Sequence, residues 1–292
     1  MEKMLIIFKR ISWVLRLSAA LSTKERYKIL IYYFCYILYP KHKFIAEILD
    51  KLSIRKSTLS FIPCIPESKH NKFGVPESSE LGFQMWLWRN YPQRYHLNFM
   101  MESWKRFSFQ PRISVILPIY NPRLEFLIHA IESILEQTYP NWQLCICTDG
   151  PQHESVHETL LAYSKLDPRI ITEFRQERKH ISATSNAAIQ MVRGEFVALL
   201  DQDDIYSPHA LHEVVKYLNN NRDVDFLYSD EAKIDEEGKF CLPFHKPDWS
   251  PDYFNSIMYV CHLLVFRKDL LHKISGFREG FEGSQDWDLV LR

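Results

Sequence analysis

The sequence predicts an α/β fold in which a mostly parallel sheet carries helices on both faces, preceded by a helical extension. From residue 113 onward, short and continuous apolar runs alternate with longer segments of helical periodicity. This alternation favours a parallel sheet, because parallel strands are joined by crossover connections that are usually helices. The run ISVILPI is apolar at nearly every position, which is typical of a strand buried on both faces. We expect residues 1–110 to form the extension and a linker, and residues 111–292 to form the α/β domain.

The first predicted strand is ISVILPI at residues 113–119, and the segment after it has the apolar spacing of an amphipathic helix. Ser207 and Pro208 are typical of a helix start, with the serine as cap and the proline in the first turn. Further strands are expected at residues 143–148, 169–174, 195–200 and 224–230, and helices at residues 124–137, 153–165, 182–192 and 208–219.

The N-terminal part changes character along its length. Residues 1–55 are apolar and basic, residues 56–80 are rich in Ser, Pro and Lys, and residues 81–107 are crowded with aromatic side chains. We expect a helical segment, then a linker, then one or two short docking helices.

An uncharged run of 11 residues at 29–39 lies among basic side chains within residues 24–43. A membrane-spanning helix needs roughly 20 apolar residues, so this run is too short to cross a bilayer. It fits either a buried helix of a small subdomain or a peripheral contact with an anionic membrane surface. The first residues lack a small-residue cleavage site, which argues against a secretory signal peptide.

Composition excludes some functions and indicates a compartment. The formal net charge is zero, with 36 basic and 36 acidic residues, which argues against a nucleic-acid platform and its excess of Lys and Arg. None of the six cysteines forms a CxxC pair. We therefore expect reduced thiols in a cytoplasmic protein, without a zinc site.

Polar residues follow the apolar runs at the points where the predicted strands end. Parallel strands have their carboxyl ends at one edge of the sheet, and ligands bind beyond that edge. We therefore expect the residues after the strands to share one acidic rim. They are Pro118, Tyr120 and Asn121; Thr148, Asp149 and Gly150; Asp201, Asp203 and Asp204; and Ser229, Asp230 and Glu231.

The densest negative charge is in FVALLDQDD, where Asp201, Asp203 and Asp204 follow an apolar strand. Clustered carboxylates repel one another unless a positive charge neutralises them, and Mg²⁺ or Mn²⁺ with oxygen ligands is the usual partner. The chain has no GxxxxGK[ST] or GxGxxG motif, so a phosphate-bearing ligand would depend on such a cation. The alternative is that the three aspartates cap a turn and face solvent.

Several spaced segments follow one another between about residue 111 and residue 292. They are ISVILPIYN, ESILEQTYPNWQLCICTDG, ISATSNAAIQMVRGEFVALLDQDD, YSDEAKIDEEGKFCLPFHKPDWSPDYF, CHLLVFRKDLL and GFREGFEGSQDWDLVLR. With these segments the stretch resembles the family 2 glycosyltransferases, whose nucleotide-binding fold is called GT-A, and the later segments are similar to a bacterial branch that builds surface polysaccharide.

The resemblance implies roles for five residues on the donor side. Tyr120 would lie against the nucleotide base, with Pro118 and Asn121 beside it in the donor site. Asp149 would accept a hydrogen bond from the base edge, and His262 would line the pocket near the donor. From its residue type alone, a histidine such as His262 is more often a hydrogen-bonded core residue.

The resemblance also implies the metal ligands and the catalytic base. Asp203 would bind the metal directly, Asp201 would face the ribose or reach the metal through water, and Asp204 has no clear role. Asp286 would be the base that removes a proton from the acceptor hydroxyl. Apart from the resemblance, Asp286 next to Ser284 could simply be a carboxylate favoured at a helix N-terminus.

The implied function is inverting, metal-dependent transfer of a sugar from a nucleotide-diphosphate donor, UDP or dTDP, to a hydroxyl of a glycan or lipid-linked acceptor. We expect it in the cytoplasm, with peripheral contact at the inner face of the membrane. The second hypothesis is a truncated or inactive relative that binds a nucleotide sugar and acts as an interaction module. A nucleotidyltransferase is a weaker third.

Some features depart from the family pattern or leave their meaning open. Thr148 stands where family members often carry a second acidic residue, and residues 178–180 are basic where many relatives have a small, Gly-rich segment. These basic residues could approach a diphosphate or face water. The sequence ends six residues after Asp286, so we expect an incomplete C-terminal end.

Two groups of side chains have competing interpretations as well. Trp86, Trp88 and Trp104 could stack on sugars, but we expect them to pack the N-terminal segment onto the domain. His153 and His157 have the spacing of a helical metal site, and without a third ligand we expect them to face solvent.

Overall fold

The computed structural model describes residues 78–235 and 238–292. The predicted membrane contact at residues 24–43 and the apolar run at 29–39 lie outside these residues. Residues 83–292 form one compact unit. Within the described residues, no helix has the length and apolar character needed to cross a membrane.

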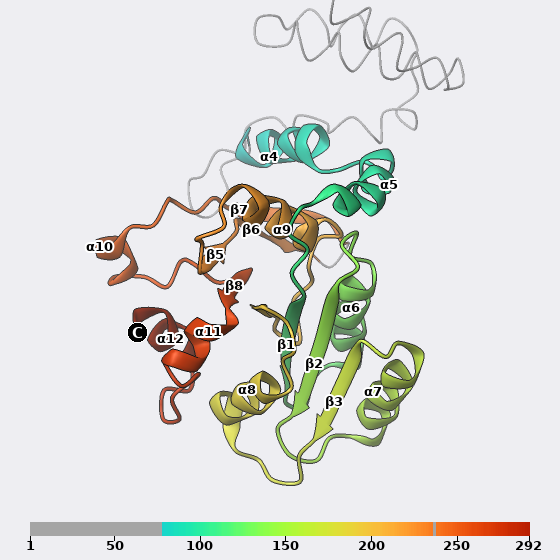
Figure 1. Cartoon of the computed structure of the whole chain (residues 1–292), viewed down its shortest axis with the longest axis vertical. Helices are drawn as coiled ribbons and strands as arrows, with labels where there is room; N and C mark the ends of the chain where they lie inside the picture. The colour runs from blue at the N-terminus through green and yellow to red at the C-terminus, as the bar shows by residue number, and fades with distance from the viewer. Residues whose placement is uncertain (1–77, 236–237) are drawn as a thin grey trace, which may run out of the picture. The chain divides into compact units, whose positions relative to one another are not determined.

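A six-stranded sheet forms the centre of this unit, in the order β3-β2-β1-β4-β8-β5 (Figure 1). The strands β1 to β4 are parallel, whereas β8 runs antiparallel to both β4 and β5. The prediction of a mostly parallel sheet is therefore confirmed. The strands are β1 Ile113–Ile119, β2 Trp142–Thr148, β3 Ile170–Phe174, β4 Phe196–Leu199, β5 Phe226–Tyr228 and β8 Leu264–Arg267.

Helices cover both faces of the sheet because each presents an apolar stripe to it. In α6, the residues Leu127, Ala130, Ile131 and Ile134 are fully buried, which follows the i, i+3, i+4, i+7 spacing of the sequence. Figure 1 shows α6 and α7 on one side of β1–β3 and α8 on the other. The helices that connect the parallel strands are α6 Leu124–Leu135, α7 Glu154–Leu166, α8 His180–Gln190 and α9 Ala210–Asn220.

One helix start differs from its prediction. Helix α9 begins at Ala210, and its N-cap is His209 rather than Ser207. The backbone at Ser207 and Pro208 instead binds the segment that follows α6. The carbonyl of Ser207 accepts from Gln137 Nε2 at 2.8 Å, and that of Pro208 accepts from the Thr138 amide at 2.8 Å. Long-range hydrogen bonds therefore override the local helix-start pattern.

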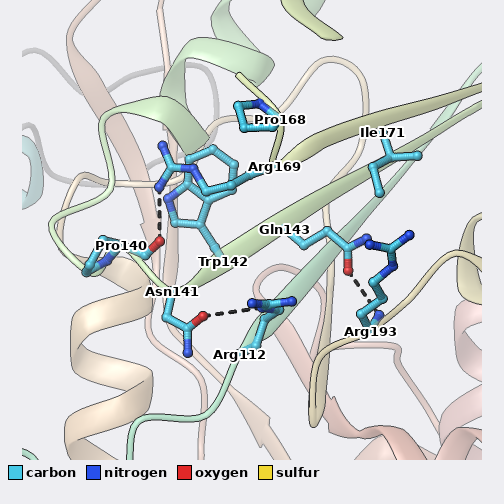
Figure 2. A pocket seen from close by; sticks show the side chains of 9 residues that line it. All are labelled: Arg112, Pro140, Asn141, Trp142, Gln143, Pro168, Arg169, Ile171 and Arg193. Atoms are coloured by element: carbon cyan, nitrogen blue, oxygen red, sulfur yellow. Dashed lines mark hydrogen bonds between the residues drawn. The ribbon is translucent and has the colours of Figure 1, made fainter. Parts of the chain in front are cut away.

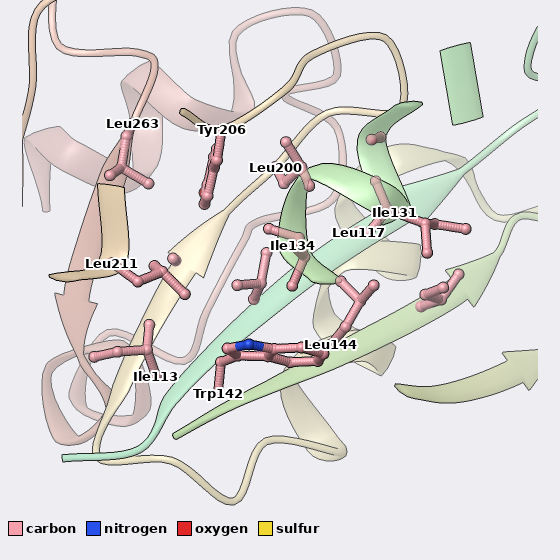
Figure 3. Close-up of a cluster of buried hydrophobic side chains, with 14 of the residues drawn as sticks. Ile113, Leu117, Ile131, Ile134, Trp142, Leu144, Leu200, Tyr206, Leu211 and Leu263 are labelled. Atoms are coloured by element: carbon pink, nitrogen blue, oxygen red, sulfur yellow. The ribbon is translucent and has the colours of Figure 1, made fainter. Parts of the chain in front are cut away.

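The core has two parts, one on each face of the sheet. Figure 3 shows the first, in which Trp142 and Ile113 from the sheet pack with Ile134 of α6 and Leu211 of α9. The second packs the other sheet face against α8 and the C-terminal helices, with Phe254 and Leu289 among its members. The sheet thus packs against α6 on one face and against α12 on the other.

Strand β8 is the strand of the central sheet that the predicted strands omit, and the two strands of the small second sheet, β6 (Glu231–Ile234) and β7 (Phe240–Phe244), were not predicted either. The β8 residues Leu264, Val265 and Phe266 are buried, and they lie between β4 and β5. The apolar run LLVF was the available signal, but a short run cannot reveal which strands it will pair with.

The remaining elements lie before and after the central strands. The N-terminal docking helices are present as α4 and α5, and the Trp104 ring packs edge-on at 6.0 Å from Tyr139 against the core. The bounds are α4 Ser78–Asn90, α5 Arg94–Ser103, a 3₁₀ turn Trp104–Arg106, β6 Glu231–Ile234, β7 Phe240–Phe244, α10 Pro251–Phe254, α11 Lys268–Lys273 and α12 Gln285–Leu291.

Candidate active site

The carboxyl ends of β1 and β4 meet where the strand order reverses direction. From β1 the chain proceeds to β2 and β3 on one side, and β4 then lies on the other side of β1. Ligands of open α/β sheets bind at such switch points. Two hydrogen bonds join the loops here: the Tyr120 amide donates to Gln202 Oε1 at 2.9 Å, and Gln202 Nε2 donates to the Tyr120 carbonyl at 3.2 Å.

An aspartate pair and a histidine lie together at this end of β4. His262 Nε2 is 3.5 Å from Asp201 Oδ2 and 3.7 Å from Asp204 Oδ2. The register explains the approach, because Leu199 of β4 pairs with Leu264 of antiparallel β8. Asp201 follows Leu199 by two residues and His262 precedes Leu264 by two, so the pairing brings them face to face. We call Asp201, Asp204 and His262 the acidic trio.

The acidic trio has a donor set that suits a divalent cation. One ligand atom from each residue lies within 4.8 Å of the others, and no other group of three His, Cys, Asp or Glu in the described part of the chain is arranged this way. Two carboxylate oxygens and one imidazole nitrogen fit Mn²⁺, and the carboxylates fit Mg²⁺.

Burial and mutual repulsion shape the charge of the trio. Burial raises the pKa of Asp201, and the charge of Asp203 acts in the same direction while His262 opposes it. Burial likewise raises the pKa of Asp204. Carboxylates that resist ionisation gain most from a bound cation, since the cation stabilises their charged form.

Asp203 lies outside the acidic trio. Its side chain is exposed on the turn between Asp201 and Asp204. The sequence prediction ranks Asp203 first as the direct ligand and Asp204 last, whereas the structure places Asp204 with His262. The role of Asp203 as a metal ligand stays a prediction.

Two hydrogen bonds hold the turn that carries Asp201 and Asp204. The hydroxyl of buried Tyr206 donates to the Leu199 carbonyl at 2.5 Å, and the Asp204 amide donates to the Asp201 carbonyl at 3.2 Å. Sequence reasoning alone does not identify Tyr206 as part of this site, because an aromatic after an acidic turn carries no specific signal.

The loops after β1 and β2 form an aromatic and polar surface beside the trio. The Tyr120 ring is 46% exposed, and the Arg178 guanidinium lies 4.0 Å from its centroid. Arg178 Nε is also 3.7 Å from Asp149 Oδ2. The predicted alternatives for Arg178 were solvent or a diphosphate, and the structure places it between Tyr120 and Asp149.

Asp149 is buried, with 4% of its surface exposed. Its Oδ1 accepts from the Lys179 amide at 2.6 Å. The next residue, Gly150, has φ of +77°, and a Cβ there would lie 3.2 Å from the Arg178 amide nitrogen. The close approach of the two loops therefore needs glycine. The predicted contact between Asp149 and a base edge stays a prediction.

The other two predicted donor-side residues lie at the end of β1. Pro118 is half-buried within the strand, and Asn121 is exposed directly after Tyr120. The Asn121 amide donates to Gln152 Oε1 at 2.8 Å, and its φ is +42°. The structure thus brings all the predicted donor-side residues to one edge of the sheet.

Asp286 lies in the first turn of α12 and interacts electrostatically with the acidic trio. Burial raises the pKa of Asp286 to about 6, the charge of Asp201 adds to the increase, and His262 opposes it. Gln285 Nε2 donates to Asp286 Oδ2 at 3.1 Å. A carboxylate with this pKa is ionised at neutral pH and is a stronger base than an ordinary aspartate.

Neighbouring contacts hold α12 in place. Asp288 is buried and forms ion pairs with Arg278 and with Arg292, the latter at 3.0 Å. Trp287 Nε1 donates to the Phe254 carbonyl at 3.1 Å. These contacts anchor the short helix that carries Asp286.

Two features singled out in the sequence do not contribute to the site. His153 caps α7, with its Nδ1 accepting from the Ser155 amide at 3.3 Å, and the His157 ring packs 4.3 Å from that of Phe174. Both histidines are exposed, as predicted; His153 caps the helix and His157 packs on an aromatic ring.

A separate pocket lies at the opposite edge of the sheet, at the start of the strands. Figure 2 shows three arginines around it. Arg169 lies 3.6 Å from the centre of the Trp142 ring and pairs with Asp167 at 2.6 Å. Because the acidic rim is at the other ends of the same strands, this pocket is not part of the candidate active site.

The sheet order, with the acidic trio at its switch point, agrees with the GT-A type glycosyltransferase fold that the following comparisons show. The family described as Glycosyl transferase family 2 matches residues 114–275, more than half of the chain. The chain belongs to this family.

Similar proteins include longer polysaccharide enzymes. An uncharacterized protein, y4gI of Sinorhizobium fredii, is 42% identical over 193 residues, which is 66% of this chain and 21% of that protein. The O-antigen biosynthesis protein RfbC of Myxococcus xanthus is 34% identical over 191 residues, 65% of this chain and 15% of RfbC. The chondroitin synthase of Escherichia coli is 27% identical, over 62% of this chain and 26% of the synthase. The chain thus spans only a small part of the length of these relatives.

Solved structures share the fold at low identity. S. aureus TarS 1–349 in complex with UDP has a TM-score of 0.51 and 16% identity, covering 62% of this chain and 54% of that chain. The complex of TarS 1–349 with UDP-GlcNAc has a TM-score of 0.50 and 16% identity, covering 62% and 52%.

Proposed function

We propose that this domain is an inverting, metal-dependent glycosyltransferase of cell-surface polysaccharide synthesis. It moves a sugar from a nucleotide-diphosphate donor to a hydroxyl of a growing glycan or lipid-linked acceptor. The observation that carries the proposal is the cluster of Asp201, Asp204 and His262 at the switch point of the sheet, in a chain that belongs to family 2. Asp286 supports it, because burial and the charge of Asp201 raise the pKa of its carboxyl.

Asp286 is the group we assign as base. An acceptor hydroxyl is a weak nucleophile, so a carboxylate within hydrogen-bond reach removes its proton as the new glycosidic bond forms. The hydroxyl oxygen attacks the anomeric carbon directly, and the bond from that carbon to the diphosphate breaks. One displacement of this kind inverts the anomeric centre without a covalent intermediate.

Asp201, Asp204 and His262 are the residues that would hold a divalent cation, Mn²⁺ or Mg²⁺, with Asp203 as the further predicted ligand. Such a cation supplies Lewis-acid stabilisation of the charge that grows on the leaving diphosphate. The backbone that carries the trio is held by the hydrogen bond of the Tyr206 hydroxyl to the Leu199 carbonyl and by the pairing of β4 with β8.

The surface of Tyr120, Arg178 and Asp149 is where we place the nucleotide. The exposed ring of Tyr120 offers a stacking face, and Asp149 offers an acceptor for a base N–H. The likeness to TarS, which has been solved with UDP and with UDP-GlcNAc, supports a UDP donor. A dTDP donor presents the same kind of base edge and belongs to the same proposal.

The acceptor side follows from the relatives. RfbC is named for O-antigen biosynthesis and the E. coli relative for chondroitin synthesis, which supports a glycan acceptor. We further propose that the reaction takes place at the cytoplasmic face of the membrane, with residues 24–43 as a peripheral contact. Their basic and aromatic composition supports this placement.

The test is a donor-turnover assay on the purified chain. UDP- and dTDP-sugars are supplied with Mn²⁺ or Mg²⁺ and with oligosaccharide or lipid-linked acceptors, and both nucleotide release and glycan products are measured. Asp286→Asn removes the base at nearly constant shape. Asp223→Asn, at an exposed position before β5, is the matched control.

We expect turnover that needs the cation, is lost in Asp286→Asn and is retained in Asp223→Asn. Donor binding with no turnover in the wild-type protein, whatever acceptor is supplied, would favour the interaction-module hypothesis instead. A product that retains the anomeric configuration would contradict the single displacement.

A further inference from the structure

A buried lysine lies beneath the turn that carries His262. Lys246 follows β7 in the segment FHKPDWSP, and its side chain is only 1% exposed. Its ammonium group is therefore removed from water, which is costly for a charge unless partners replace the lost hydration. Those partners are the backbone of residues 260–262 and one carboxylate.

The ammonium group donates to the carbonyls of this turn. Lys246 Nζ is 2.8 Å from the Cys261 carbonyl oxygen, 2.8 Å from that of His262, and 3.4 Å from that of Val260. Three consecutive carbonyls thus converge on one cation. An arrangement of this kind fixes the path of the backbone, because each carbonyl would otherwise turn toward another donor.

Glu231 completes the arrangement from the other side. Its Oε2 lies 2.9 Å from Lys246 Nζ and accepts a hydrogen bond from the His262 amide at 2.6 Å. Both the N–H and the C=O of His262 are therefore held by the same ion pair. The following residue is held as well, since the Leu263 amide donates to Ser229 Oγ at 3.3 Å.

The consequence for the acidic trio is geometric. With its N–H and C=O fixed, His262 can rotate only about its side-chain bonds, and its Nε2 lies within 3.5 Å of Asp201 and 3.7 Å of Asp204. Outer contacts that orient a ligating imidazole are part of how proteins tune metal sites. Here the orientation is set through the backbone of His262.

We propose that Lys246 and Glu231 are positioning residues, which hold the turn at residues 260–262 so that the His262 imidazole faces Asp201 and Asp204. The inference rests on the proposed function, in which the trio holds a divalent cation. It adds two residues that touch neither the donor nor the reacting atoms but determine whether the cation site forms.

The test removes the charge of Lys246 while keeping its length. Lys246→Met is compared with Lys233→Met, which changes an exposed lysine on β6 of the same hairpin. The double variant Lys246→Met/Glu231→Gln removes both charges and keeps an oxygen to accept from the His262 amide. It serves if the single variant fails to fold, because a lone buried charge is strongly destabilising.

Two measurements separate the turn from the chemistry. Amide hydrogen exchange of His262 and Leu263, without metal, reports whether the turn is held. Binding of Mn²⁺ alone, followed by the loss of the free-ion electron paramagnetic resonance signal, reports the cation site. We expect exchange at these amides to speed up by about tenfold or more, and Mn²⁺ affinity to fall by about 10- to 100-fold.

A kinetic pattern distinguishes positioning from general damage. In a folded Lys246→Met protein, saturating Mn²⁺ should restore most of kcat, whereas the Mn²⁺ concentration for half-maximal rate rises. Lys233→Met should behave as wild type in all three measurements. Unchanged exchange or unchanged Mn²⁺ affinity in a folded Lys246→Met protein would overturn the proposal. Wild-type protein that binds no Mn²⁺ would refute the proposed metal site, and the exchange experiment would still decide whether the pair holds the turn.

Discussion

The donor side and the catalytic side of the candidate site are built in different ways. Donor-side residues such as Tyr120 and Asp149 directly follow parallel strands that alternate with helices along the chain. We count His262 here with the catalytic side, although the resemblance places it near the donor, because antiparallel β8 positions it in the acidic trio; Asp286 is positioned by the short helix α12. The first side depends on local pattern, whereas the second depends on pairing and packing between distant segments. Changes on the catalytic side should therefore be the more damaging.

The largest effect should come from Asp286. Replacing it by asparagine removes the only group we assign as base, and general bases contribute typically 10²- to 10⁴-fold. We expect kcat to fall by about that factor, with the donor dissociation constant unchanged, as measured by steady-state kinetics and calorimetry. An equal loss of donor binding would place Asp286 on the donor side and break the comparison.

The pH dependence sharpens the same point. Because the pKa of Asp286 is raised to about 6, kcat/KM should rise with pH through about 6 and then level off. The stability contributed by neutral Asp286 is fully present below about pH 4 and is lost as pH rises through about 6. Asp286→Asn should therefore be more stable than wild type at pH 8, by about 3 kcal/mol, and nearly equally stable near pH 4. Urea denaturation at both values measures this.

The acidic trio should show the next largest effect. His262→Ala removes the nitrogen ligand that β8 supplies, so Mn²⁺ affinity should fall by about 10- to 100-fold. His245→Ala is a matched control, because His245 is an exposed histidine near the same hairpin and faces Asp230 at 3.2 Å instead. Equal affinity in the two variants would exclude His262 as a ligand.

Strand β8 itself can be tested through its packing. Leu264 is fully buried beside β4, and Leu264→Ala should cost about 2–5 kcal/mol of unfolding free energy. Leu242 is 71% exposed, so Leu242→Ala should leave stability nearly unchanged. Denaturation curves measure the stability. Mn²⁺ binding by the folded Leu264→Ala protein shows whether the cation site depends on the position of β8 beside β4.

The smallest effect should be that of Arg178 on the donor side. Its guanidinium lies over the exposed Tyr120 ring, and such contacts at exposed sites contribute about 0.5–1 kcal/mol. Arg178→Ala should raise the donor KM by about 2- to 5-fold and leave kcat unchanged. A large loss of kcat instead would mean that Arg178 acts on the diphosphate, and the two sides would be less separate than the structure indicates.

The sequence predicted the parallel strands and the residues at their ends well, because the signals for them are local. A continuous apolar run followed by polar residues specifies both a buried strand and the rim where it ends, as at Ile119 and Tyr120. The helix start at Ser207 failed for the complementary reason, since Gln137 and Thr138 bind that backbone from a distant segment.

By itself, the sequence determined the α/β class, the parallel strands β1 to β4 and the acidic rim, since periods of hydrophobicity and strand-end residues are written along the chain. It also placed Asp201, His262 and Asp286 in the candidate site through family resemblance. Only the tertiary structure decided that Asp204 rather than Asp203 lies with His262, and that a buried lysine holds the turn behind it. These features depend on the antiparallel register of β8 and on contacts between segments far apart in sequence, which no local pattern encodes.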